Sequence, residues 1–255
     1  MGIFIGPRRR RLYSESLLHG EPWSWLVDQH PILHGLAPDD LERLRELTAA
    51  FAHQKTFEAA EGMRLDETVL AVVSLQACLP VLNLGLSWYS NLKTVVVVPK
   101  DFDQEHREID LTGVVHEWSE VDAGESWDQG PVVLSWEDVE ASGWADGFNV
   151  VIHEVAHRLD LLDGAVNGRP SLHKEMDPEE WKAVFTAAFR DLEQRVRRRR
   201  RTAVDPYALE NPGEFFAVTS ELFFEKPRAL RAQYSRVYDL LSTFYRQDPA
   251  SRLPG

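Results

Sequence analysis

Apolar residues recur at helical spacing in several separate segments of the chain. After Pro38, for example, Leu41, Leu44, Leu47 and Phe51 recur every three or four residues. We predict helices over residues 38–54, 66–79, 148–162, 178–201, 212–224 and 230–245.

A different pattern predicts a few short strands before the third of these helices. Residues 94–98 (TVVVV) form a β-branched run that ends at a proline, which favours a buried strand. Residues 114–118 and 131–136 are two further extended segments, separated by the turn-rich string AGESWDQG. The chain is therefore predicted to be an α+β protein, mostly helical, with a small sheet before the helix over 148–162. We expect a single domain over residues 1–255, of which residues 1–20 are weakly ordered.

Composition narrows the range of functions. The chain has 44% hydrophobic and 27% charged residues, which is typical of a globular protein. A net charge of −13 argues against a nucleic-acid surface. The apolar run over residues 68–84 is broken by polar residues and is short for a membrane span, and no secretory signal follows the basic start. We therefore expect a cytoplasmic protein with neither a nucleic-acid nor a membrane partner.

The string HEVAH, residues 153–157, carries the candidate chemistry. On a helix, His153 and His157 lie one turn apart on nearly the same face, so both imidazoles can reach one metal ion. Glu154 projects beside the first ligand, where it can take a proton from an activated water molecule. The alternative is a surface helix that carries two histidines by chance. The apolar neighbours of these residues predict a core helix instead, where unsatisfied polar groups are costly. We therefore predict one Zn²⁺ per chain, the ion that suits two imidazoles and a carboxylate.

A third ligand is expected from the helix over residues 212–224. Glu214 and Glu221 are seven residues apart and share a face of that helix, two turns from each other. Either carboxylate could bind the metal while the other orients a histidine. The spacing alone leaves both assignments open.

Three strings together resemble one known family. HEVAHRLD, DPYALENPGEFFAVTSELFFEKP and FYRQDP are similar to the Mlc titration factor A family of bacterial zinc metallopeptidases. The catalytic region of that family is similar to the C-terminal domain of anthrax lethal factor. The resemblance runs over most of the chain, from about residue 17 to residue 253, and implies a zincin-like fold.

The resemblance also implies roles for particular residues. His153, His157 and Glu214 would be the zinc ligands, Glu154 the general base, and His116 a further ligand in some states. Tyr207, seven residues before Glu214, would donate a hydrogen bond to the oxyanion; on its own residue type it could equally be a structural tyrosine. Residues 131–136 resemble the edge strand along which such enzymes bind an extended substrate.

Two classes of function follow. The first is a peptidase, by the resemblance an aminopeptidase acting on short peptides. The second is a regulatory protein that sequesters a transcription factor and keeps a latent or structural metal site, because the family resemblance implies binding to Mlc, a glucose-responsive repressor. The five arginines over residues 197–201 would serve such a partner, or they simply form a solvated helix end.

Overall fold

The computed structural model describes residues 18–60, 63–99 and 130–253. The predicted strand over 114–118, the turn-rich string up to residue 129, His116 and most of the expected weakly ordered start lie outside these ranges. Among the described residues, no helix is both long enough and apolar enough to cross a membrane. The longer helices are α2 (Gly20–Asp28), α3 (Pro38–Gln54), α4 (Glu67–Cys78), α6 (Val150–Asp160), α7 (Pro178–Arg197), α8 (Pro212–Glu225) and α10 (Ser235–Tyr245).

Shorter elements complete the described chain. The strands are β1 (Thr56–Ala59), β2 (Thr94–Val98) and β3 (Val132–Ser135). The short helices are η1 (Pro31–Leu33), η2 (Leu86–Tyr89), α5 (Trp136–Ala141), η5 (Leu161–Asp163), η6 (Pro206–Leu209), α9 (Pro227–Gln233) and α11 (Pro249–Arg252).

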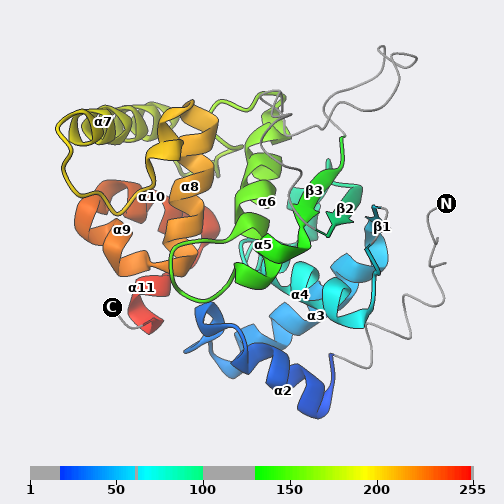
Figure 1. The fold of residues 1–255 in the computed structure, drawn as a ribbon. Coiled ribbons are helices and arrows are strands. Elements are labelled where there is room, and N and C mark those ends of the chain that lie inside the picture. The colour runs from blue at the N-terminus through cyan, green and yellow to red at the C-terminus, as the bar shows by residue number, and fades with distance from the viewer. Residues whose placement is uncertain (1–17, 61–62, 100–129, 254–255) are drawn as a thin grey trace, which may run out of the picture.

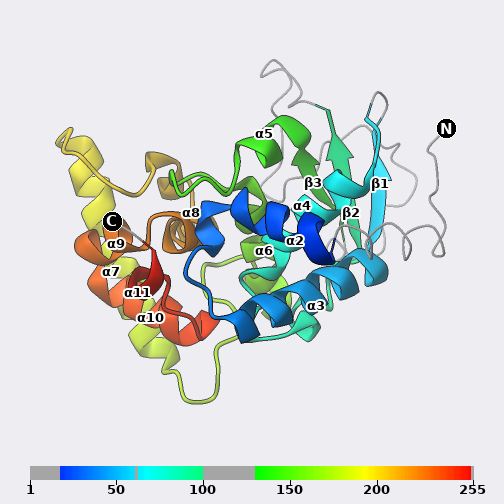
Figure 2. The same cartoon turned by 90° about the horizontal axis from the view of Figure 1, so that it is seen from below.

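The three described strands form one parallel sheet in the order β1-β2-β3. Thr56 pairs with Thr94, and Val95 pairs with Val132. The sheet precedes α6 in the chain, and Figure 1 shows it on one side of α6, with α7 to α11 on the other. In Figure 2, α2 and α3 lie nearest the viewer. The predicted α+β class, mostly helical with a small sheet before the HEVAH helix, is therefore confirmed.

Aromatic packing fixes the C-terminal helices against one another. Trp181 and Phe185 of α7 stack with ring centroids 4.2 Å apart. Phe216 of α8 lies 6.0 Å from Trp181 and 6.1 Å from Phe244 of α10. These side chains are almost fully buried, so α8 is held on a rigid support.

Local side-chain caps account for the starts of two helices, α4 and α5. Asp66 caps α4, because its side chain accepts a hydrogen bond from the Val69 amide. The predicted strand over 131–136 is shorter in the structure and ends at Ser135. The Ser135 side chain accepts from the Asp138 amide and so begins α5 at Trp136.

Two helix predictions were wrong in extent. The helix predicted to reach residue 201 ends at Arg197, because Arg199 adopts a left-handed conformation and the Arg200 amide bonds back to the Arg195 carbonyl. The helix predicted over 230–245 is divided at Tyr234, whose hydroxyl bonds to Asp191 of α7. The division between α9 and α10 therefore coincides with a tertiary contact to α7, which the periodicity of the sequence does not reveal.

Candidate metal centre

Helix α6 begins at a strong cap and is anchored by its apolar face. The Asn149 side chain accepts a hydrogen bond from the Ile152 amide at 2.9 Å. Five apolar residues of α6 are almost completely buried: Val151, Ile152, Val155, Ala156 and Leu159. Because this face is fixed in the core, His153 and His157 are turned together toward α8.

Helix α8 supplies carboxylates to the same place. Pro212 occupies its first turn, and the Asn211 side chain accepts from the Glu214 amide at 3.0 Å. Residues 215–225 are all buried, whereas Glu214 is half-buried. Figure 1 shows α8 running beside α6.

The donor atoms of three residues converge. His153 Nε2 lies 3.0 Å from Glu214 Oε2, and His157 Nε2 lies 3.3 Å from Glu214 Oε1. The two Nε2 atoms are 3.1 Å apart. Two ligands bound at about 2.0–2.1 Å to a tetrahedral Zn²⁺ are themselves roughly 3.3 Å apart. The three side chains are therefore already spaced as ligands of one ion.

The bonding of Glu214 fits a cation as well. Its Oε2 atom is buried and has no hydrogen-bond partner of good geometry within the described ranges, although His153 Nε2 is close. Burial alone raises the pKa of Glu214, but its contacts with the two imidazoles outweigh this and hold the pKa at about 2. The carboxylate is thus ionised and surrounded by nitrogen atoms, which is the donor chemistry that a divalent metal ion requires.

Glu221 takes the other position that the sequence left open. Its Oε1 atom lies 2.6 Å from His153 Nδ1, and its Oε2 accepts from the Asn149 amide at 3.0 Å. Burial lowers the pKa of His153, but its contacts with the carboxylates of Glu214 and Glu221 reverse this effect and raise the pKa to about 10. Glu221 therefore orients the imidazole of His153 so that its Nε2 atom faces Glu214.

His157 is held differently from His153. Its Nδ1 atom is buried and has no hydrogen-bond partner in the part of the chain that the structure describes. The orientation of this ring therefore depends on packing and on its contact with Glu214.

The remaining predicted residues lie around this cluster. Glu154 is half-buried, and its charge opposes the burial that lowers the pKa of Arg158. Tyr207, in η6, is 53% exposed, and its ring centroid lies 6.2 Å from that of His153. The guanidinium of Arg158 donates to the Pro131 carbonyl at 2.9 Å and so ties α6 to the start of β3.

Sequence reasoning missed two buried carboxylates on the same helix pair. Glu225 accepts from the Asn149 side chain and from the Gly143 amide, and burial raises its pKa to about 7. Asp160 is fully buried and accepts from the Gly168 amide. The only signal in the sequence was an acidic residue one turn beyond a predicted site residue, which is too common a pattern to be specific.

Two histidines of the HEVAH helix beside a glutamate of a second helix form a group that could hold a metal ion, as in a metallopeptidase. Residues 5–246 match the family described as glucose-regulated metallopeptidase M90, so the chain belongs to that family and the resemblance seen in its motifs is confirmed.

Named relatives are similar over nearly their whole length. Mlc titration factor A of Salmonella gallinarum is 35% identical over 94% of this chain and 92% of its own length. The protein of the same name from Salmonella arizonae is 36% identical over 90% of this chain and 93% of its own length. An uncharacterised Synechocystis protein is 35% identical over 95% of this chain and 89% of its own length.

Proposed function

We propose that this chain is a zinc-dependent peptidase that binds one Zn²⁺ through His153, His157 and Glu214. The observation that carries the proposal is the convergence of the two imidazole Nε2 atoms on the Glu214 carboxylate, at 3.0–3.3 Å. In this proposal Glu221 orients His153 and is not a ligand. The family resemblance adds His116, outside the described residues, as a further ligand in a resting state.

The chemistry of the site would be hydrolysis by activated water. A zinc ion bound there supplies a Lewis acid that activates water and polarises the scissile carbonyl. Glu154 would accept the proton of the attacking water and pass it to the leaving amine. The exposed Tyr207, next to His153, would donate a hydrogen bond to the developing oxyanion.

The substrate would be a short peptide that pairs with β3. In the described sheet this strand stands at the end of the order β1-β2-β3, and the Arg158–Pro131 bond holds its start next to the HEVAH helix. By its family resemblance we propose an aminopeptidase. Parallel assays of peptides with free and with acetylated N-termini test this preference.

Replacing Glu154 with Gln tests the mechanism. We expect zinc to remain bound and hydrolysis of a panel of short chromogenic peptides to fall by at least about 100-fold, because the proton acceptor is lost. Glu140→Gln, at an exposed position, is the matched control. Peptidase activity retained in Glu154→Gln would rule the mechanism out.

A second candidate function rests on the name of the relatives. They are called Mlc titration factor A, so we propose an Mlc-type transcriptional repressor as a binding partner. If the chain acts only by sequestering that partner, neither wild type nor Glu154→Gln will hydrolyse peptides, and both will bind the repressor equally. Turnover by the wild type assigns the site to catalysis.

A further inference from the structure

A compact junction joins α6, α7 and α8 next to the candidate metal centre. At its middle is Gly168, in the loop between η5 and α7. The Gly168 amide donates to Asp160 Oδ2 of α6 at 2.7 Å, and its carbonyl accepts from the Trp181 indole of α7 at 2.9 Å. Both polar groups of this residue are thus satisfied by buried side chains from two different helices.

The same glycine lies against the first turn of α8. Gly168 has a φ of +78°, and a Cβ atom there would lie 2.3 Å from the Pro212 carbonyl oxygen. Gly213 is also closely approached, since its Cβ would lie 2.6 Å from the Val166 side chain and 3.0 Å from Asn211 Oδ1, with Asp160 Oδ2 in van der Waals contact at 3.6 Å. Because Pro212 and Gly213 directly precede Glu214, the position of Gly168 limits where the Glu214 backbone can lie.

Burying the carboxylate of Asp160 is energetically unfavourable, so a role beyond a single structural hydrogen bond is worth considering. Its side chain is fully buried, and Oδ1 has no hydrogen-bond partner of good geometry in the ranges that the structure covers. A buried carboxylate with one unsatisfied oxygen costs stability. Its benefit is orientation, because it fixes the Gly168 peptide from the helix that carries both histidines.

We infer that Asp160 is a positioning residue for Glu214: through the Gly168 backbone it sets the first turn of α8 against the histidines of α6. The inference rests on the proposed metal site, and it concerns a residue that contacts none of the three ligands by hydrogen bond within the described ranges. Its consequence is that the affinity for metal depends on a bond made outside the ligand set.

Metal affinity in three variants tests the inference. Zinc affinity is measured by chelator competition, and the ligand geometry by the visible absorption of the Co²⁺-substituted protein. We expect Asp160→Ala to bind zinc about 10–100-fold more weakly and to alter the cobalt spectrum. Asp160→Asn, whose amide oxygen can still accept from Gly168, should recover affinity to within about threefold of wild type.

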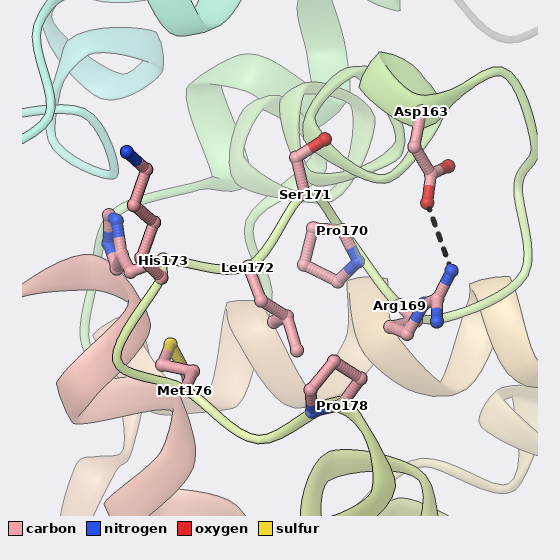
Figure 3. Close-up of a pocket in the computed structure, with 9 residues that line it drawn as sticks. Asp163, Arg169, Pro170, Ser171, Leu172, His173, Met176 and Pro178 are labelled. Atoms are coloured by element: carbon pink, nitrogen blue, oxygen red, sulfur yellow. Dashed lines mark ion pairs between the residues drawn. The ribbon is translucent and has the colours of Figure 1, made fainter.

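Asp163→Asn is the matched control. Asp163 lies three residues further along and forms an exposed ion pair with Arg169, 3.5 Å apart, at the edge of the hollow drawn in Figure 3. That hollow, of about 370 Å³, includes none of the three proposed ligands and is lined by Asp163, residues 169–174, Met176 and Pro178. Zinc affinity and cobalt spectrum should therefore be unchanged in this variant.

Each result decides the matter. If Asp160→Ala only lowers the melting temperature and binds zinc with wild-type affinity and spectrum, Asp160 is structural and the inference is wrong. If that variant does not fold, Asp160→Leu replaces it, since it fills a similar space without an acceptor for the Gly168 amide. Weaker zinc binding in folded Asp160→Leu supports the inference, and wild-type binding overturns it. A wild type that binds no metal instead defeats the proposed function itself.

Discussion

The two ends of the α6–α8 helix pair hold the candidate ligands by different means. At one end, Glu221 of α8 bonds directly to His153 and to the first residue before α6, Asn149. At the other end, Asp160 of α6 bonds to the loop at Gly168, which lies against the first turn of α8. The first histidine is therefore fixed by a side-chain hydrogen bond, whereas His157 depends on packing and on its contact with Glu214, and Glu214 depends on how the first turn of α8 is placed. The difference indicates that direct carboxylate contacts and loop geometry contribute separately to one site.

The largest effect on zinc affinity is expected from Glu214→Gln, which removes the carboxylate that both His153 and His157 face. Without this anionic ligand, zinc affinity should fall by more than about 100-fold, beyond the loss caused by changing an orienting residue. Chelator competition measures the change, with the exposed Glu210→Gln as the control. Wild-type affinity in Glu214→Gln would show that Glu214 is not a ligand.

The hydrogen bond between Glu221 and His153 Nδ1 is tested by Glu221→Gln. This change leaves the ligand set complete but weakens the hold on His153 Nδ1, so zinc affinity should fall about 10–100-fold. The same chelator competition applies. If the loss equals that of Glu214→Gln, then Glu221 is itself a ligand and the two carboxylates are not distinct in role.

The third prediction concerns Glu225, which lies at the Glu221 end of the helix pair, and the pH dependence of the free energy of unfolding. Burial raises its pKa from 4.5 to about 7, so the folded protein binds this proton more tightly than the unfolded chain. Raising the pH from about 4.5 to above about 7 should therefore cost up to about 3 kcal/mol of stability through this group.

Urea unfolding of wild type and Glu225→Gln at a series of pH values measures that effect. The variant should lose less stability over this interval than wild type, while the exposed Glu140→Gln should follow wild type. Parallel curves for wild type and Glu225→Gln would contradict the assignment.

The smallest effect is expected at the start of α8. The Asn211 side chain caps this helix through the Glu214 amide, and Asn211→Ala should cost about 1 kcal/mol in the free energy of unfolding. Asn211→Asp keeps the cap and should be nearly neutral. A loss as large in Asn211→Asp as in Asn211→Ala would mean that the cap is not the cause.

The sequence could predict what depends on local patterns. The HEVAH helix and the buried strand over 94–98 follow from spacing and residue type within a few residues. The choice between Glu214 and Glu221 could not be made, because it depends on how α8 lies against α6, more than 50 residues away in the chain. The Asp160–Gly168 bond and the helix break at Tyr234 are tertiary features of the same kind.

The most direct test of the proposed centre is zinc X-ray absorption on the purified wild-type chain, with metal content measured on the same sample. We predict one zinc per chain, bound by two imidazoles and oxygen atoms at about 2.0–2.1 Å. Absence of zinc, or a zinc environment with sulfur or with no imidazole, would contradict the His153–His157–Glu214 centre.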